Sequence, residues 1–315
     1  SGNTRMSKEH PANKAASIRD KLYNLSRKNG RNFQEIVQYY AMERFLYRLG
    51  QSEFQHSFVL KGALMLRVWN VPQARATMDI DLLGTLDNSA SFIEACIQKI
   101  LDVPVPDDGL SFDPESVTSM EITQESDYRG RRILFFGYLE RMRIRMKIDI
   151  GFSDIVLPAP IPIHFPTALD MNPPMLQGYT RESAIAEKFH AMVFLGLQNS
   201  RMKDFYDIYV LSSHHSFEGN LLSRSLQATF ERRHLDIPSS LIITSSSFLK
   251  MKEVQWTAFL KKFPVSLLSG IPVHLKEVVQ RISFFLLPPC EALLSKASFE
   301  KTWNPSTGSW DESMS

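Results

Sequence analysis

The chain has 315 residues, of which 43% are hydrophobic and 22% are charged, and its formal net charge is +2. This composition is ordinary for a globular protein, and the length suits one large domain or two smaller ones. A net charge this small does not indicate nucleic-acid binding by the chain as a whole, so such a function must rest on local clusters. No apolar run approaches the ~20 residues that span a bilayer, and the polar N-terminus lacks a signal-peptide core. We expect a cytoplasmic protein.

The first predicted elements are two helices between residues 13 and 50, separated by Gly30. Apolar side chains recur there at helical spacing. Residues 58–62 then predict a short strand that runs into a turn, and residues 63–69 predict a short helix.

The most distinctive stretch is the strand predicted over residues 76–83, which contains Asp79-Ile80-Asp81. Side chains alternate between the two faces of a strand, so both aspartates are expected on one face. Two neighbouring carboxylates repel each other unless a cation lies between them. Mg²⁺ is the usual cation because it prefers carboxylate oxygens and leaves positions for phosphate. The pattern predicts a metal-dependent site that handles phosphate groups.

The middle of the chain predicts a helix over residues 89–101 and then three strands, over 117–122, 132–139 and 141–151. Little helix separates these strands, so this part of the sheet is expected to be antiparallel or mixed. The two cysteines, Cys96 and Cys290, have neither metal-ligand nor disulfide spacing, and we expect buried thiols.

The last of these strands alternates between an apolar and a charged face. The charged face carries Arg141, Arg143, Arg145 and Lys147 and ends in Asp149. It is either an ordinary solvent-facing strand or a surface that faces phosphates. If the strand lies beside the Asp79–Asp81 strand, three carboxylates converge. The third acid is then either a base toward an attacking hydroxyl or a further metal ligand.

A proline-rich stretch over residues 158–174 predicts a crossing between domains, and the pattern after it is almost wholly helical. The last helix, over 275–296, is expected to break or kink at Pro288-Pro289. From Trp303 the tail is expected to be disordered. The predicted division is N-terminal helices over 1–50, a core over 51–170, a helical lobe over 171–302, and the tail over 303–315.

Two helices of the lobe carry candidate functional residues. Lys188 lies on the first, and Asp204 and Asp207 share a face of the second because they are three residues apart. The connection over 196–200 is short enough for a helical hairpin, which would bring Lys188 near Asp204. Lys188 is then a solvated surface lysine, one half of a structural ion pair, or a lysine that the acid orients toward a triphosphate.

Six blocks of sequence together resemble a known family. They are Glu43–Leu49, Phe58–Gly62, Arg75–Leu82, Ile148–Asp149, Glu182–Lys188 and Arg201–Asp207. In this order and spacing, over about residues 13–212, they resemble the nucleotidyltransferase toxins of the AbiEii/AbiGii group, which includes the MenT toxins of toxin–antitoxin systems. An isolated Asp-x-Asp would be a weak signal, whereas the combination is specific.

The resemblance implies an α+β fold, with a polymerase-β-like nucleotidyltransferase core of mixed sheet and helices and a helical C-terminal lobe. It implies Mg²⁺ (or Mn²⁺) held by Asp79 and Asp81, with Asp149 as the third acid. Asp204 would support the site. The residues implied to bind the nucleotide triphosphate are Lys61, Gly62, Thr77 and Lys188. The family's turn is often Gly-Gly or Gly-Ser, whereas Ala63 here has no hydroxyl for a phosphate.

The implied reaction transfers a nucleoside monophosphate from an NTP to an acceptor and releases pyrophosphate. Characterised relatives modify the 3′ end of tRNA and thereby stop translation. We expect a toxin of a toxin–antitoxin or abortive-infection system, with NTP, RNA (tRNA) and a cognate antitoxin as partners and no membrane. The candidate RNA contacts are Arg129, Arg131, Arg132, Arg143, Arg145 and Lys147.

Two other hypotheses stay open. The chain is a nucleotidyltransferase that modifies a protein or a small molecule, or it is an inactive module that binds a nucleotide or a partner protein. The three retained acids argue against the inactive module. The basic clusters favour RNA over a protein acceptor.

Overall fold

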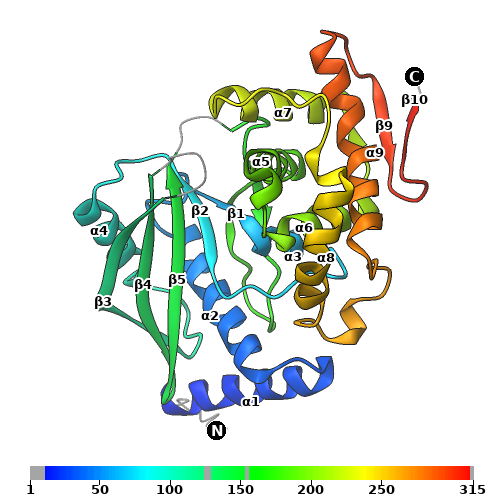
Figure 1. Cartoon of the computed structure of the whole chain (residues 1–315). Coiled ribbons are helices and arrows are strands. Elements are labelled where there is room, and N and C mark those ends of the chain that lie inside the picture. The colour runs from blue at the N-terminus through cyan, green and yellow to red at the C-terminus, as the bar shows by residue number, and fades with distance from the viewer. Residues whose placement is uncertain (1–10, 124–128, 153–155, 313–315) are drawn as a thin grey trace, which may run out of the picture. The chain divides into compact units, whose positions relative to one another are not determined.

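The computed structural model describes residues 11–123, 129–152 and 156–312, and Figure 1 labels helices and strands among them. The chain divides into two units, each built from segments that are not contiguous in sequence. The first unit comprises Ser1–Leu64, Ala76–Ser153 and Pro162–Gly178, and the second comprises Met65–Arg75, Asp154–Ile161 and Tyr179–Ser315. The N-terminal helices therefore belong to the same unit as the predicted core. The helical unit also takes in two short segments that precede residue 162.

Within the described residues of the first unit, the strands form one mixed sheet of seven strands, in the order β3-β4-β5-β2-β1-β7-β6. β3, β4 and β5 form an antiparallel meander, whereas β2 runs parallel to β5 and β1 runs parallel to β7. This confirms the predicted α+β fold with a mixed sheet. The strands are β1 (Phe58–Lys61), β2 (Ile80–Gly84), β3 (Leu110–Thr123), β4 (Arg129–Leu139), β5 (Met142–Phe152), β6 (Ile161–His164) and β7 (Met175–Gly178).

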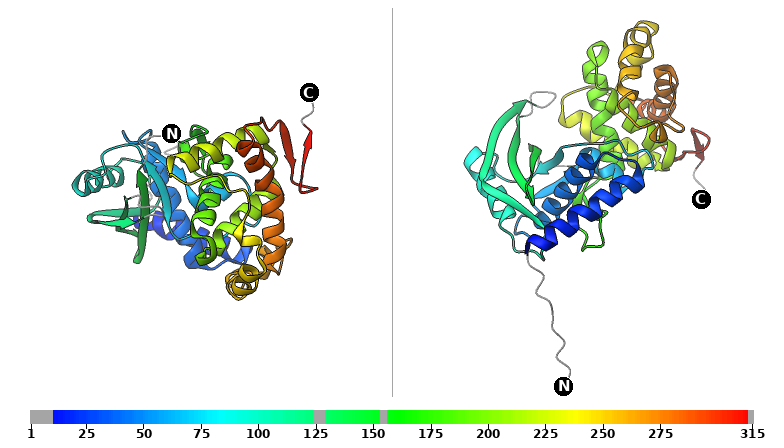
Figure 2. Two further views of the ribbon diagram at one scale, coloured as in Figure 1. Left: turned by 45° about the horizontal axis from the view of Figure 1, so that its top comes forward. Right: turned by 90° about the horizontal axis from the view of Figure 1, so that it is seen from below.

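Helices cover one face of this sheet: α1 (Pro11–Asn29), α2 (Phe33–Gly50) and α4 (Ala90–Leu101). Figure 2 shows α1 and α2 alongside the strands from two further directions. The alternation in β5 explains which face is covered, because Ile144, Met146 and Ile148 are buried whereas Arg143 and Arg145 are exposed. The charged face predicted from the sequence is therefore the face opposite the helices.

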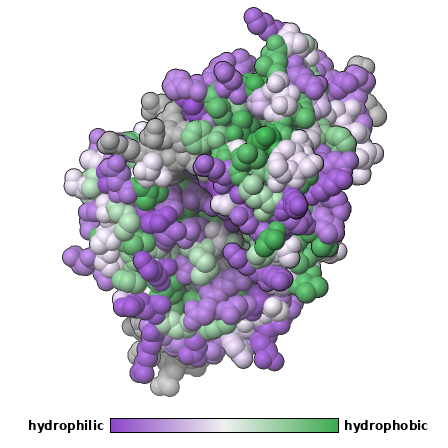
Figure 3. Space-filling view, viewed as in Figure 1, coloured by the Kyte–Doolittle hydropathy of each residue, from purple (hydrophilic) through white to green (hydrophobic). Residues whose placement is uncertain are grey.

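The second unit is helical. Its core contains aromatic side chains from several helices, among them Phe205, Trp256 and Phe285, which are fully buried. Figure 3 shows an apolar patch in the region of α5 (Arg181–Leu195). Two large apolar side chains near the end of this helix are partly exposed, Phe194 in α5 at 49% and Leu197 in the short helix η3 (Gly196–Gln198) at 43%. The elements are α3 (Met65–Val68), α5 (Arg181–Leu195), α6 (Met202–His214), α7 (Gly219–Arg232), α8 (Ser246–Leu260) and α9 (Leu275–Leu294), with the short helices η1 (Gly62–Leu64, in the first unit), η3 (Gly196–Gln198), η4 (Ile242–Thr244) and η5 (Val265–Leu267).

The end of the chain differs from the expectation. The tail is not disordered over its described length, because β9 (Lys301–Asn304) and β10 (Ser309–Glu312) form a hairpin that pairs with β8 (Phe217–Glu218). Trp303 is fully buried, and its indole N–H donates to the carbonyl of Ser212 at 2.7 Å. The polar Asn-Pro-Ser-Thr-Gly-Ser stretch is the hairpin loop, with Gly308 at a φ of 69°.

Of the predicted break or kink at Pro288-Pro289, the break is wrong, since α9 continues through both prolines to Leu294. Proline has no N–H, so Pro289 leaves the carbonyl of Phe285 without its usual partner four residues on. The indole N–H of Trp310 donates to that carbonyl instead, at 3.1 Å. A bond from the C-terminal hairpin thus replaces one of the two helical bonds that the prolines remove.

Cys96 and Cys290 are free and buried, as expected. Of the helices in the described ranges, none combines the length and the apolar character needed to cross a membrane.

Candidate active site

Charged side chains form a row across the centre of the sheet. Lys61 on β1 lies opposite Asp81 on β2, and Asp81 is the register partner of Asp149 on β5. Asp149 in turn lies opposite Arg132 on β4. Residues directly opposite one another on neighbouring strands project from the same face. The structure therefore brings two of the predicted acids together between a lysine and an arginine.

The strand predicted to begin at residue 76 begins at Ile80, so Asp79 lies just before β2 and not within it. The Thr77 hydroxyl donates to the carbonyl of Asp79 at 3.3 Å and accepts the Asp79 N–H at 3.4 Å. Such local bonds compete with the hydrogen bonds of a sheet. The N–H of Thr77 donates to the Tyr39 hydroxyl at 3.0 Å. The hydroxyl that was expected to bind nucleotide thus shapes the backbone that carries Asp79.

Each of two acids is paired with a cation from the neighbouring strands. Lys147 Nζ lies 2.8 Å from Asp79 Oδ2. The guanidinium of Arg132 binds both oxygens of Asp149, each at 2.8 Å. The pKa of Arg132 is raised, chiefly by the hydrogen bond to Asp149 and further by the negative charges of Asp149, Asp79 and Asp81. All three acids therefore act on one guanidinium.

Gly62 lies at the turn after β1 with a φ of 73°, in the left-handed region that favours glycine. A Cβ at this position would overlap Asp81 Oδ2, so the carboxylate of Asp81 rests directly against the backbone of the turn. Ala63, the departure from the family's turn, has a buried side chain. A glycine in the turn therefore leaves the space that the Asp81 carboxylate occupies.

The donor set of Asp79 and Asp81 fits a divalent metal. Carboxylate oxygens are the ligands that Mg²⁺ and Mn²⁺ prefer. Among the side chains of the described ranges, no three histidine, cysteine or carboxylate groups converge on one metal position. Mg²⁺ in phosphate-handling enzymes usually takes one or two protein carboxylates and completes its shell with water and substrate phosphates. Two acids are therefore sufficient for such an ion.

The second unit contains a buried cluster of charged side chains. Lys188 on α5 binds two acids of α6, with its Nζ 3.2 Å from Asp204 Oδ1 and 2.7 Å from Asp207 Oδ2. Arg75 binds both oxygens of Asp207 at 2.8 and 2.9 Å, and Arg201 Nε lies 2.7 Å from Asp204 Oδ2. The side chain of Lys188 is only 14% exposed, so Lys188 is not a solvated surface lysine. The α5–η3–α6 hairpin brings Lys188 to Asp204, as the short connection predicted.

Charge pairing outweighs burial in this cluster. Burial alone would raise the pKa of Asp207, but the positive charges of Arg75 and Lys188 lower it to about 2. Burial alone would lower the pKa of Lys188, but the negative charges of Asp207 and Asp204 raise it above its ordinary value. Lys188 is therefore held in its charged form.

The candidate RNA contacts divide into two groups. Arg132 is paired with Asp149 of the row and Lys147 with Asp79 just before β2, whereas Arg143 and Arg145 are exposed on the same face of the sheet. Arg131 donates from its Nε to the carbonyl of Asn88, and the side chain of Arg129 lies outside the described part.

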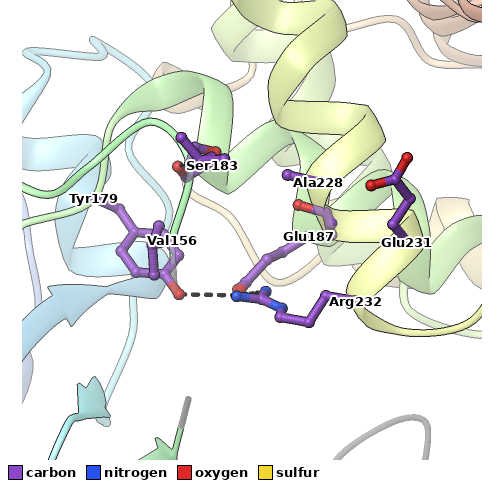
Figure 4. Close-up of a pocket in the computed structure, with 9 residues that line it drawn as sticks. Val156, Tyr179, Ser183, Glu187, Ala228, Glu231 and Arg232 are labelled. Carbon is purple, nitrogen blue, oxygen red and sulfur yellow. Dashed lines mark hydrogen bonds and ion pairs between the residues drawn. The ribbon is translucent and has the colours of Figure 1, made fainter. Parts of the chain in front are cut away.

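A further cavity in the second unit, of about 230 Å³, lies between α5, α7 and the segment around Leu157. Figure 4 shows that Tyr179 and Arg232 point toward Glu187 there; the Tyr179 hydroxyl donates to Glu187 at 2.9 Å, and Arg232 lies 3.9 Å from the same carboxylate. None of the predicted site residues lines this cavity.

The sequence pattern paired Asp207 with Asp204 on one helix face but did not indicate its contacts with Lys188 and Arg75. It assigned no role to Arg75 and did not indicate that Arg132 binds Asp149. The three-residue spacing of Asp204 and Asp207 was a usable signal, because it places both acids on one helix face. The partners of Arg75 and Arg132 are distant in sequence, so no local pattern indicates them.

The match to a known family covers most of this arrangement. The model of the family described as "Nucleotidyl transferase AbiEii toxin, Type IV TA system" matches residues 44–283, which is more than half of the chain. These residues include both clusters of charged side chains.

Two solved structures are similar to this chain, both from Helicobacter pylori. One is the crystal structure of JHP933, with 15% identity, coverage of 84% of this chain and 94% of that one, and a TM-score of 0.44. The other is described as a "putative nucleotidyltransferase", with 16% identity, coverage of 84% and 96%, and a TM-score of 0.42. No curated protein matches the chain. At these TM-scores, neither structure adds to the assignment, which rests on the family match. The chain belongs to the AbiEii family, the nucleotidyltransferase toxins of type IV toxin–antitoxin systems.

Proposed function

We propose that the protein transfers a nucleoside monophosphate from an NTP to the 3′ end of an RNA, with tRNA as the acceptor, and that this transfer blocks translation. The observation that carries the proposal is the row of Lys61, Asp81, Asp149 and Arg132 across the sheet, with Asp79 and Lys147 beside it. Such a row offers carboxylates for a metal and cations for phosphate on one face.

Asp79 and Asp81 are the residues proposed to hold Mg²⁺ or Mn²⁺. The ion supplies charge neutralisation for the phosphates of the NTP. Lys147, which is paired with Asp79 at 2.8 Å, lies close enough to keep that carboxylate in place. Gly62 leaves the space that the Asp81 carboxylate occupies.

Asp149 is proposed to accept the proton of the attacking hydroxyl. The acceptor oxygen forms a bond to the α-phosphorus, the bond from that phosphorus to the bridging oxygen breaks, and pyrophosphate leaves. A carboxylate has about four lone-pair positions, and Arg132 engages one on each oxygen. The remaining positions are the ones proposed to accept the hydroxyl, while Arg132 fixes the orientation of the carboxylate.

Lys61 and Lys188 are proposed to bind phosphate oxygens. An ammonium group has three N–H donors, and described residues engage Lys188 at two points, Asp204 and Asp207. The third N–H donor is proposed to bind a phosphate oxygen, while the two acids hold the side chain in place. In this proposal Asp204 positions Lys188 and does not touch the substrate.

Membership of a type IV toxin–antitoxin family implies a cognate antitoxin. We propose that the toxin acts in the cytoplasm, where NTPs and tRNA are present, and that its activity serves abortive infection.

The test is transfer of label from each radioactive NTP, with Mg²⁺, to the components of a total cell extract. We expect label in a band of tRNA size, and we expect Asp79→Ala to abolish both this label and growth inhibition while the fold is retained. Asp102→Ala, at an exposed position away from the row, is the matched control and should keep full activity. Label in protein bands would show that the acceptor is a protein and not an RNA. A fully toxic Asp79→Ala variant would refute the enzymatic mechanism.

A further inference from the structure

The open face of β4 and β5 carries aromatic rings between its arginines. Tyr138 on β4 lies opposite Arg143 on β5, and Phe136 lies opposite Arg145. Directly opposed residues share a face, so all four side chains project on the side away from the covering helices. Phe136 and Tyr138 are partly exposed, and both arginines are exposed.

The arrangement is unusual for a solvated strand. Partly exposed rings lie beside guanidinium groups that form no ion pair with any described residue, whereas Lys147 and Arg132 on the same face are both paired with acids. The guanidinium of Arg143 lies 4.6 Å from the centroid of the Phe136 ring. The guanidinium, which is flat and positively charged, therefore covers one face of the ring.

This face leads to the acids. Arg143, Arg145, Lys147 and Asp149 follow one another along β5 at every second residue. At ~3.3 Å per residue, Arg143 and Asp149 are about 20 Å apart along the strand. A single strand that lies along β5 with phosphates at the arginines can therefore bring its terminal hydroxyl to Asp149.

We propose that this face binds the single-stranded 3′ end of the RNA acceptor. Bases stack on Tyr138 and on the Arg143–Phe136 pair, and Arg143 and Arg145 contact phosphates. RNA-binding proteins commonly read single strands by stacking bases on aromatic rings and guanidinium planes. The positive charge of the face complements the phosphate backbone. The inference rests on the proposed function, because the 3′ hydroxyl must reach Asp149 for transfer.

The test measures binding of a fluorescent single-stranded RNA oligonucleotide by anisotropy without NTP, over a series of salt concentrations. Phe136→Leu with Tyr138→Leu keeps apolar packing and removes both rings, and we expect at least about tenfold weaker binding with the salt dependence unchanged. Arg143→Gln with Arg145→Gln should reduce the slope of log K against log salt by about 1.4, since each phosphate contact to a single strand contributes about 0.7.

The matched control is Arg27→Gln with Arg224→Gln, which makes the same change of charge at exposed positions on α1 and α7. It should alter neither the RNA affinity nor the slope of log K against log salt. Asp79→Ala should lose transfer and keep RNA affinity. If the wild type labels RNA and both face variants bind it within about twofold of wild type, this surface is rejected and the proposed function stands. If the wild type neither binds RNA nor labels it, and protein is labelled instead, the RNA-binding surface and the proposed RNA acceptor are both rejected.

Discussion

Asp207→Asn is the most informative test of the buried charge cluster. Asp207 is fully buried and binds Arg75 through both oxygens and Lys188 at 2.7 Å. Asparagine has nearly the same shape but offers one oxygen and presents an N–H₂ group to cations. Both partners would keep their charges in a site where the side chains of Arg75 and Lys188 are only 13% and 14% exposed.

The expected loss is several kcal/mol of unfolding free energy. Removing one partner of a buried ion pair costs about 3–5 kcal/mol. An independent figure comes from the pKa of Asp207, which is lowered from 3.8 to about 2. At about 1.4 kcal/mol per pKa unit, this contributes about 2–3 kcal/mol of stability. A loss of about 3 kcal/mol at neutral pH agrees with both figures.

The pH dependence has a definite sign. Because the folded pKa of Asp207 is depressed, its contribution is present above the unfolded value of 3.8 and is lost as the pH falls through about 2. The difference in unfolding free energy between wild type and Asp207→Asn should therefore be constant above about pH 5 and shrink below it.

Urea unfolding followed by tryptophan fluorescence is a suitable assay, because all four tryptophans lie in the second unit. Asp236→Asn, at an exposed position, is the control for the loss of one negative charge. A double-mutant cycle with Arg75→Gln isolates the pair, and its coupling energy should exceed 1 kcal/mol, at the scale of about 0.5–3 kcal/mol for contacting residues. A destabilisation by Asp207→Asn within about 0.5 kcal/mol of the control, the scale of ordinary surface changes, would refute the reasoning.

Three further outcomes are expected. Gly62→Ala should reduce nucleotide transfer by at least about tenfold, because its Cβ would displace Asp81; Gly30→Ala, at a φ of 61° with nothing within 4 Å, shares the backbone strain and should keep transfer intact. Arg132→Gln should lower kcat by about 10–100-fold with little change in KM for the NTP, measured with labelled nucleotide, because the third acid loses its orienting partner. Trp310→Phe keeps a ring but removes the donor to the α9 carbonyl, and should lower the urea midpoint by an amount equivalent to about 1–3 kcal/mol.

The parts of the site that follow from local pattern were predictable from the sequence. The alternation around Asp149 placed the acid on the charged face of its strand, and the short connection after α5 predicted the hairpin that joins Lys188 to Asp204. Each of these two predictions used only residues of one strand or of two consecutive helices. The family resemblance supplied the remaining roles.

The parts that depend on distant contacts were not predictable. Arg132 was assigned to RNA because a strand's own pattern does not reveal the register that sets it opposite Asp149. Trp303 was assigned to a disordered tail because the polar loop next to it resembles a linker, whereas its pairing with β8 and its contact with Ser212 in α6 are distant in sequence. The missing N–H of Pro289 is compensated by an indole that lies 21 positions later in the chain.

The interleaving of the two units sets an order of events during synthesis. β1 pairs with β2, which follows it closely, but its other neighbour is β7, which begins at Met175. At about 5–20 residues per second, a ribosome needs several seconds to go from the end of β2 to the start of β7. During that time β1 has an open edge, the kind of edge that pairs with other chains. A nascent chain that ends before residue 175 lacks β7. Its Asp79, Asp81 and Asp149 can therefore lie only in an incomplete sheet.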